Sequence, residues 1–469
     1  TPTLIPSPVP SPTAGATPAT NPPITAVGSG QLPAISRDLL FISEGGFKRW
    51  NHRTGQIDTL VAGPPAAQRT YPDPDDPRRY YGFPGDVTHY DVSDNGTRAI
   101  VARIVRSDIV PVALAGQEEP RDLVRLIQEL IYVDLVSGET WVVTPAIYNV
   151  RALDLSPNGE RIAVSATGVG TPPEPIIISE YAADWPWAMF VQEMQGGNGR
   201  DTRRVATCDQ LCDQPVWHVE NNLVVWSDSG DLWLYNISAN DPELLLAGEQ
   251  VDPNIPEMRE HFGPIDWANN GRYLRVWRSV IEGGSQAVLD IPTGALIDIP
   301  NSFVYIDPLP IEISWMPDDR LLIASNGNSE QPTPTLSLWR VLLEEGRVNQ
   351  EEALTLSGQS VGVTGSRHLA DGRFAYALVG NGTSSDSGTY LLTSLSQSPE
   401  RVNAVPDSNL GADFPWSAGD MGVYWVSDGS GAIVSLAGET YYAPANGDFL
   451  YNVSAALGRG ATDFYWQNQ

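Results

Sequence analysis

The sequence contains almost no cysteine. Cys208 and Cys212 are the only two in 469 residues, and they stand close together in Cys-Asp-Gln-Leu-Cys. A structural zinc site takes four protein ligands, so two thiols without further partners do not form one. The spacing favours a local disulfide between Cys208 and Cys212, which is typical of an oxidising, extracytoplasmic compartment.

Long hydrophobic runs and basic residues are also scarce. No run of about 18 or more apolar residues occurs, so the sequence predicts no membrane-spanning segment. Only 28 basic residues stand against 57 acidic ones, which gives a net charge of −29. Nucleic acids and anionic lipids attract basic surfaces, so we expect neither as a partner. The acids indicate a solvated surface or, as a sharper alternative, divalent-cation binding at acidic loops.

The motifs of several common enzyme classes are missing. The sequence has no Gly-x-Ser-x-Gly, no His-Glu-x-x-His, no P-loop and no dinucleotide-binding fingerprint, and its five histidines are widely scattered. We therefore predict a protein without catalytic residues, without a metal site and without a cofactor.

What the sequence does contain is a repeated hairpin. Its clearest copy is Arg151–Ala166, in which two short apolar segments flank Ser-Pro-Asn-Gly. Pro fixes φ, Asn tolerates left-handed φ and Gly adopts positive φ without steric cost, so this tetrapeptide favours a tight turn between strands. Aligned on the turn, one column, four positions before the glycine, is mostly tryptophan: Val92, Leu155, Trp217, Trp267, Trp315, His368 and Trp416.

The repeat length indicates a propeller. Successive copies lie about 48 to 63 residues apart, a spacing typical of solenoids and propellers. Most copies continue with a second hairpin, and four strands make one propeller blade. The sequence therefore predicts an all-β fold in which residues 35–469 form a single β-propeller.

The two ends of the chain complement each other. The first hairpin, which includes Leu39 and Phe41, has no inner strand before it, whereas Phe464 and Trp466 form a strand without a hairpin after it. Trp466 also falls in the tryptophan column. We predict that the C-terminal strand pairs with the N-terminal hairpin and closes a ring of eight blades, with seven as the fallback, because closure removes two exposed strand edges.

The repeat resembles a known family. Trp315-Met-Pro-Asp-Asp-Arg-Leu-Leu-Ile-Ala324 and Leu155-Ser-Pro-Asn-Gly-Glu-Arg-Ile-Ala-Val164 are similar to the repeat of the TolB-like, or PD40, class of WD40-like β-propellers. The resemblance covers roughly residue 35 to the end of the chain. It implies a fold but no catalytic residue, because the family includes periplasmic scaffolds, enzyme-appended propellers and surface proteins.

Residues 1–34 form an extended tail rich in threonine and proline. Such a segment favours polyproline II, and one interpretation is a disordered or O-glycosylated stalk of the kind found in bacterial surface proteins. However, apolar residues are spread along it, and the tail could bind its own propeller or add a strand to a neighbouring copy. The candidate assembly contacts are Leu4, Ile5, Val9, Ile24 and Val27.

Four Asn-x-Ser/Thr sequences are candidate glycosylation sites if the host glycosylates. They begin at Asn95, Asn236, Asn381 and Asn452.

These observations favour a secreted, bacterial-type protein at the cell surface or outside the cell, with the signal segment absent from this chain. We interpret it as a non-enzymatic structural subunit whose tail joins copies into a filament or surface layer, so the expected partners are copies of itself. One alternative is a monomeric or lipid-anchored binding module for a peptide or glycan. The other is a glycan-active propeller enzyme with acids converging at the ring centre.

Overall fold

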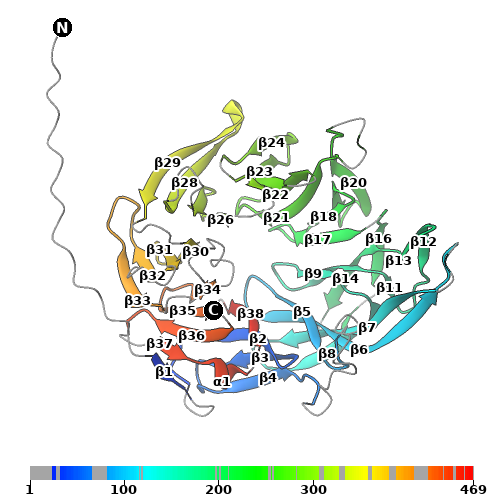
Figure 1. Ribbon diagram of the computed structural model, residues 1–469, viewed down its shortest axis with the longest axis horizontal. Coiled ribbons are helices and arrows are strands. Elements are labelled where there is room, and N and C mark those ends of the chain that lie inside the picture. Colours follow the sequence, from blue (N-terminus) through cyan, green and yellow to red (C-terminus); the bar gives the residue numbers. More distant parts are fainter. Residues whose placement is uncertain are drawn as a thin grey trace, which may run out of the picture.

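The computed structural model is an eight-bladed β-propeller (Figure 1). The described residues are 24–27, 32–65, 82–115, 117, 120–195, 198–199, 202–209, 211–251, 255, 258–280, 283–300, 302–305, 311–326, 333–356, 362–379, 387–405, 421–436, 438–446, 450–458 and 460–467.

The first four blades contain the following strands, from the ring centre outward. Blade 1 consists of β38 (Thr462–Trp466), β2 (Leu39–Ser43), β3 (Gly46–Trp50) and β4 (Ile57–Val61). Blade 2 consists of β5 (Val87–Val92), β6 (Arg98–Val112), β7 (Arg121–Asp134), β8 (Thr140–Tyr148) and β11 (Gly168–Val169). Blade 3 consists of β9 (Ala152–Leu155), β10 (Arg161–Ala166), β14 (Ala188–Gln195) and β16 (Arg203–Thr207), with β15 (Asn198–Gly199) on β14. Blade 4 consists of β17 (Cys212–Trp217), β18 (Leu223–Asp228), β19 (Asp231–Asn236) and β20 (Asp241–Leu246).

The other four blades follow the same plan. Blade 5 consists of β21 (His261–Trp267), β22 (Tyr273–Val280), β23 (Gly283–Asp290) and β24 (Ala295–Asp298), with β25 (Val304–Tyr305) on β23. Blade 6 consists of β26 (Ile311–Trp315), β27 (Leu321–Ser325), β28 (Thr335–Leu342), the 3-10 turn η3 (Leu343–Glu345) and β29 (Arg347–Thr355). Blade 7 consists of β30 (Gly362–His368), β31 (Phe374–Val379), β32 (Gly388–Leu392) and β33 (Glu400–Ala404). Blade 8 consists of β34 (Met421–Trp425), β35 (Gly431–Leu436), β36 (Glu439–Pro444), β37 (Leu450–Asn452) and β1 (Ile24–Ala26), and the short helix α1 (Ser454–Leu457) follows β37.

The turn between the first two strands of a blade also joins neighbouring blades. In blade 3 the amide of Gly159 donates to the carbonyl of Ser156 at 2.6 Å, and Gly159 has φ +69°. A Cβ added there would lie 2.6 Å from Cδ of Arg98 in blade 2, so glycine is needed for both conformation and space. On the other side, the amide of Asn158 donates to the side chain of Asn221 in blade 4 at 2.8 Å.

The hydrophobic core is divided among the junctions between blades. Each of the eight junctions around the ring contains a buried apolar cluster within the described residues. At the junction of blades 3 and 4, for example, Met189 packs with Trp217 and Trp226. The column tryptophans Trp217, Trp267 and Trp466 thus fill spaces between adjacent sheets, as expected for face-to-face packing of β-sheets.

The predicted column residue Trp416 lies outside the described residues. The inner strand of blade 8 ends at Trp425, which takes the column position before the turn at Gly429.

The predicted closure of the ring is confirmed. Strand β38 pairs antiparallel with β2, with Leu39 opposite Trp466. The rings of Phe41 and Phe464 lie 6.1 Å apart, and the indole Nε1 of Trp466 donates to the carbonyl of Tyr424 in blade 8 at 2.7 Å. All four predicted closure residues are buried. We name this pairing of residues 39–43 with 462–466 the seam; it makes eight blades rather than seven.

One projection leaves the ring. Beyond Arg103, where the pairing with β5 ends, β6 and β7 continue as a two-stranded hairpin to Val112 and Arg121. A second hairpin, β12 (Ile176–Ser179) with β13 (Ala182–Asp184), lies beside it, and Trp185 donates from Nε1 to the carbonyl of Val124 at 3.0 Å. We name residues 104–126 and 176–184, so far as they are described, the arm, which lies at the right of Figure 1.

The described part of the tail binds its own ring, which corrects the interpretation of two predicted contacts. Strand β1 pairs in parallel with β37, with Ile24 opposite Leu450, and the amide of Val27 donates to the carbonyl of Asn452 at 3.1 Å. Val27 is buried in the cluster of the seam. Ile24 and Val27 therefore contact their own blade 8, because its outer strand offers an open edge. Leu4, Ile5 and Val9 lie outside the described residues.

Candidate functional site

The two faces of the ring differ in what they carry. Each inner strand begins on one face, which we name the loop face, and ends in a tight turn on the other, the turn face. Because the blades are antiparallel, the connections between blades and the second connection within each blade also lie on the loop face. Binding residues concentrate on such loops, so the loop face and the inner strands are where a binding site is expected.

Two aspartates on adjacent inner strands contact each other. Oδ2 of Asp91, on β5, accepts from the amide of Leu155 in the next blade at 2.7 Å. Oδ2 of Asp154, on β9, accepts from the amide of Trp217 in the blade after that at 2.6 Å, and the indole of Trp217 donates to the carbonyl of Asp154 at 3.0 Å. Each carboxyl thus satisfies a backbone N–H on the open inner edge of the following blade.

Burial governs the ionisation of this pair. Burial raises the pKa of Asp154 well above its usual range, and the charge of Asp91 beside it raises it further. Burial also raises the pKa of Asp91, against its hydrogen bond from Leu155. Two carboxyl groups in contact cannot both ionise cheaply. The raised pKa values favour the protonated form in this pair, and a hydrogen bond between the two carboxyl groups suits a structural contact between blades 2 and 3.

A group of tyrosines surrounds the seam at the ring centre. The hydroxyl of Tyr90, on β5, donates to the carbonyl of Asp463, on β38. Burial raises the pKa of Tyr90 well above its usual value, with a smaller contribution from the charge of Asp463. Burial likewise raises the pKa of Tyr465 to about 12. A cavity of about 140 Å³ adjoins this group and is lined in part by Arg367, Tyr424 and Tyr465.

Three inner strands carry the same local distortion. Gln214, Gly365 and Asp463 have φ values of 45°, 64° and 54°, and each stands three residues before the column position of its strand. The pairing register shifts beside each of them, as in a β-bulge. Bulges redirect side chains and are common near functional sites. These positions could not be predicted from the sequence, because only one of the three residues is glycine.

Other acids of the inner strands are also engaged in structural bonds. Both oxygens of Glu312 on β26 accept hydrogen bonds from blade 7: Oε1 from the Thr364 hydroxyl at 2.7 Å and the Gly365 amide at 2.8 Å, and Oε2 from the Ser366 amide at 2.7 Å. Asp266 pairs with Arg275 of its own blade. These acids therefore link neighbouring strands, and their carboxyl groups do not converge on one binding point.

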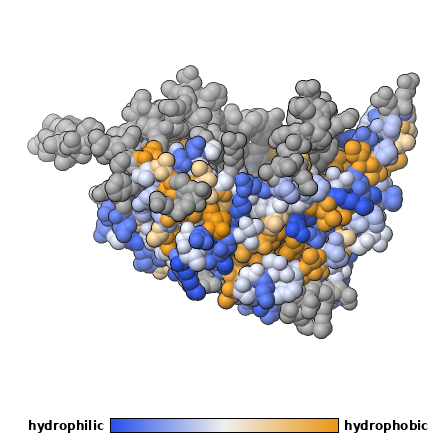
Figure 2. Space-filling view, turned by 90° about the horizontal axis from the view of Figure 1, so that it is seen from below, coloured by the Kyte–Doolittle hydropathy of each residue, from blue (hydrophilic) through white to orange (hydrophobic). Residues whose placement is uncertain are grey.

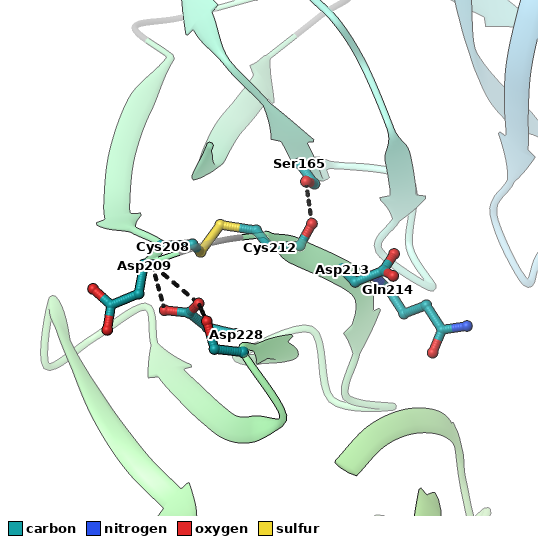
Figure 3. Close-up of a disulfide and its surroundings, with 8 residues drawn as sticks. Ser165, Cys208, Asp209, Cys212, Asp213, Gln214 and Asp228 are labelled. Carbon is teal, nitrogen blue, oxygen red and sulfur yellow. Dashed lines mark hydrogen bonds between the residues drawn. A yellow bond between two sulfur atoms is a disulfide. The ribbon is translucent and has the colours of Figure 1, made fainter. Parts of the chain in front are cut away.

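The structure contains the predicted disulfide, and it lies where blade 3 leads into blade 4 (Figure 3). Cys212 begins the inner strand β17, and its carbonyl accepts from the hydroxyl of Ser165 in blade 3 at 2.5 Å. The amide of Asp209 donates to Asp228 of blade 4 at 3.1 Å. The bond thus fixes the connection between blades on the loop face, and it is consistent with a periplasmic or extracellular protein.

A larger cavity of about 600 Å³ lies between the docked tail, blade 8 and the start of β38. Its lining includes Val27, Glu439, Ser454 and Thr462. Hydrogen bonds from Ser454 and Asn452 lower the pKa of Glu439, so its carboxylate is ionised at neutral pH. Hydroxyls beside one carboxylate could bind a sugar or an amine.

The candidate glycosylation sites differ in accessibility. Asn95 is exposed in a turn, where its side-chain oxygen accepts from the amide of Thr97 at 3.0 Å. Asn236 and Asn452 are half-buried, and the side-chain amide of Asn452 donates to Glu439 at 3.0 Å. Asn381 lies outside the described residues. Of the described sites, Asn95 is the most accessible acceptor, and glycosylation of these sites stays a prediction.

Sequence reasoning missed the aspartate pair and the tail's docking site. An aspartate directly before the column residue in three copies was the available signal for the pair: Asp91, Asp154 and Asp266.

No group of three or more His, Cys, Asp or Glu residues placed to hold a metal occurs in the part of the chain that the structure describes. Among the same residues, no helix is long and apolar enough to cross a membrane.

Comparisons with known proteins support the fold. Neither a scan of protein-family models nor a search of curated proteins found a match. Among solved structures, the dipeptidyl peptidase 4 of Porphyromonas gingivalis is similar, at 10% identity and a TM-score of 0.50, over 89% of this chain and 59% of that one. Our chain thus spans less than two thirds of that peptidase.

Two further solved structures show lower similarity. The β-propeller domain of the Trilobed protease from Pyrococcus furiosus is 9% identical, with a TM-score of 0.39, over 76% of this chain and 94% of that one. TolB from Agrobacterium tumefaciens is 12% identical, with a TM-score of 0.34, over 68% of this chain and 90% of that one. The strand pairing of the eight blades, described above, identifies the chain as a β-propeller.

Proposed function

We propose that the protein is a non-enzymatic, extracellular β-propeller of the TolB-like PD40 type, a structural subunit that joins copies of itself through residues 1–23. The attachment of the tail carries this proposal. Residues 24–27 are fixed on the outer edge of blade 8. The 23 residues before them therefore start from the rim of the ring, and extended they span about 75 Å, enough to reach a neighbouring copy.

The engagement of the inner-strand acids supports a non-enzymatic role. A general acid or base needs an accessible carboxyl beside the substrate. Asp91 and Asp154 instead use oxygens to bind backbone amides, and Glu312 accepts three hydrogen bonds. The disulfide Cys208–Cys212 supports a location outside the cytoplasm. The repeat motif Trp315–Ala324 supports membership of the PD40 class.

Truncation of the tail tests this function. The full chain and a variant lacking residues 1–23 are compared by light scattering and negative-stain electron microscopy over a range of concentrations. We expect assemblies from the full chain and monomeric rings from the truncated chain, which keeps β1 and therefore the seam cluster. Assemblies that persist unchanged in the truncated chain would refute the proposal.

A second function is favoured by the cavity beside β1. At about 600 Å³ it is large enough for a small ligand, and its hydroxyls and Glu439 suit a glycan or an amino group. The protein would then be a monomeric binding module for a glycan or peptide. Glycan and peptide arrays probed with the truncated chain, with Glu439→Gln as control, distinguish this function, because binding would not depend on residues 1–23.

A further inference from the structure

Exposed apolar side chains gather on the arm. Thirteen large hydrophobic side chains are exposed in the described part of the chain, and six of them lie on the arm: Val105, Ile109, Ile176, Ile177, Ile178 and Tyr181. Figure 2 shows the right-hand end of the molecule, where the arm projects, with hydrophobic and hydrophilic residues side by side. A concentration of exposed apolar side chains on one projection marks a candidate interaction site.

Strand β12 is the most exposed part of the arm. It pairs with β13 and with no other described strand, so its second edge is open. Every residue of β12 is exposed, and Ile177 and Ile178 are 62% and 61% accessible. Pro175 and Glu180 flank this strand and the register shifts at Ile178, but the four residues of β12 themselves carry no charge and no proline. Three consecutive isoleucines are good strand formers, and natural proteins usually protect an edge with a charge or a proline. The sequence and exposure of β12 therefore fit an acceptor edge for another strand.

The tail sequence suits a strand that is added to such an edge. If it is extended, only one of its two edges keeps all of its backbone N–H donors. In an extended strand, successive residues direct their N–H and C=O groups to opposite edges. The prolines at positions 2, 6, 8, 10 and 12 all have even numbers, so they remove donors from one edge only. The opposite edge keeps every donor, from the residues Thr3, Ile5, Ser7, Val9 and Ser11.

A donor of this kind ends the pairing that it starts. Its complete edge can bind an acceptor strand, whereas its proline edge cannot template a further strand. The residue before each proline is biased toward extended backbone, which lowers the ordering cost. Residues 1–23 also contain no Asp, Glu, Lys or Arg. An uncharged segment can approach a copy with a net charge of −29 without local repulsion.

We propose that β12 of one copy accepts a short stretch within residues 3–11 of a second copy as an added strand. This inference rests on the proposed function and names its acceptor. Strand β1 lies at the lower left of Figure 1 and the arm lies at the right, so donor and acceptor occupy different places on one ring. A contact between different surfaces does not pair two copies symmetrically, and it continues from copy to copy unless it closes into a circle. Residues 12–23 span about 40 Å and link the donor to blade 8.

Two variants separate the donor from the acceptor. One lacks residues 1–13, and the other carries Ile177→Lys and Ile178→Lys, because lysines on an edge oppose strand addition. Val136→Lys with Phe303→Lys is the matched control, since those side chains are 69% and 65% exposed and lie away from the arm. We expect the control to assemble like the wild type and both test variants to be monomeric by light scattering, with association weakened more than about 100-fold by the buried charges.

Mixing the two test variants gives the decisive result. Each supplies what the other lacks, so one donor and one acceptor remain, and we expect 1:1 dimers that do not grow. If the variant without residues 1–13 assembles, the proposed function fails, and the acceptor assignment fails with it. If that variant is monomeric but the lysine variant assembles normally, only the assignment to β12 is wrong.

Cysteine cross-linking tests the direction of the contact. Ser7→Cys is introduced in one preparation and Ser179→Cys in another, and the native cysteines are already joined to each other. The proposal predicts a disulfide-linked dimer of the two preparations on a non-reducing gel. A chain that carries both substitutions and gives only an internal cross-link would show that the tail binds its own arm, which overturns the proposal.

Discussion

The seam and the arm are built from similar apolar strands, yet they differ in what surrounds those strands. In the seam, Phe41 and Phe464 are buried between two blades. Strand β2 is paired on both sides, with β38 and with β3. In the arm, Ile177 and Ile178 are exposed on a strand with one open edge. The comparison teaches that hydrophobic strand residues stabilise the fold in one place and are available for association in the other.

The same distinction separates the two parts of the tail. Val27 is buried among seam residues and holds β1 on blade 8, so it contributes to the fold. The proline-rich residues before it have one complete edge, which suits association. Substitutions at the seam should therefore change the free energy of unfolding, whereas substitutions on the arm should change only the affinity between copies.

The largest expected effect comes from the seam. Phe464→Ala removes a buried ring that lies 6.1 Å from Phe41 and 5.3 Å from Tyr424, so we expect a loss of about 3–5 kcal/mol in the free energy of unfolding. Guanidinium unfolding followed by tryptophan fluorescence measures it. Tyr181→Ala on the arm is the control, and a loss at the seam no larger than at Tyr181 would contradict the comparison.

The next largest loss of stability is expected at the junction of blades 3 and 4, where the disulfide lies. Comparing it with the loss at Phe464 shows whether the seam stabilises the ring more than another junction does. Replacing both cysteines, Cys208→Ser with Cys212→Ser, opens a small loop and should cost about 2 kcal/mol. Thermal unfolding with and without reductant measures this loss. Reductant should lower the midpoint of the wild type but not that of the variant, and equal responses would argue against a disulfide in solution.

A smaller effect is expected from the aspartate pair. The pKa of Asp154 is raised in the folded protein, so the stability from its protonated form is present at acid pH and is lost as the pH rises through the folded pKa. Asp154→Asn keeps the acceptor for Trp217 and supplies a permanent donor toward Asp91. We expect a smaller loss of stability between about pH 5 and about pH 8 than in the wild type. Denaturant unfolding at both pH values, with exposed Asp122→Asn as control, tests this, and an unchanged loss would count against a protonated Asp154.

The smallest effect on the free energy of unfolding is expected from substitutions on the arm. This gives the clearest contrast with the seam. Ile177→Lys with Ile178→Lys changes side chains that are mostly in water, so the free energy of unfolding should stay within about 0.5 kcal/mol of the wild type. Thermal unfolding of the monomeric variant measures this. A large loss would mean that β12 supports the ring, and the arm would then resemble the seam.

Part of the candidate site could be predicted because it depends on neighbours in the sequence. Cys208 and Cys212 stand within one short loop, so their bond follows from spacing. The contact of Asp91 with Asp154 could not be predicted, because it joins strands 63 positions apart whose register is set by packing. The bulges at Gln214 and Asp463 were also hidden, because neither residue favours positive φ as glycine does.

The sequence by itself determined the repeating unit and its closure. Turn residues such as Gly159 act locally, and the spacing of the column residues sets the length of each successive blade. The strand that contains Trp466 then completes blade 1. Only the tertiary structure decided where β1 binds, which acids come into contact and which isoleucines remain exposed. Those outcomes depend on which distant segments meet, and burial and open strand edges exist only after the ring has formed.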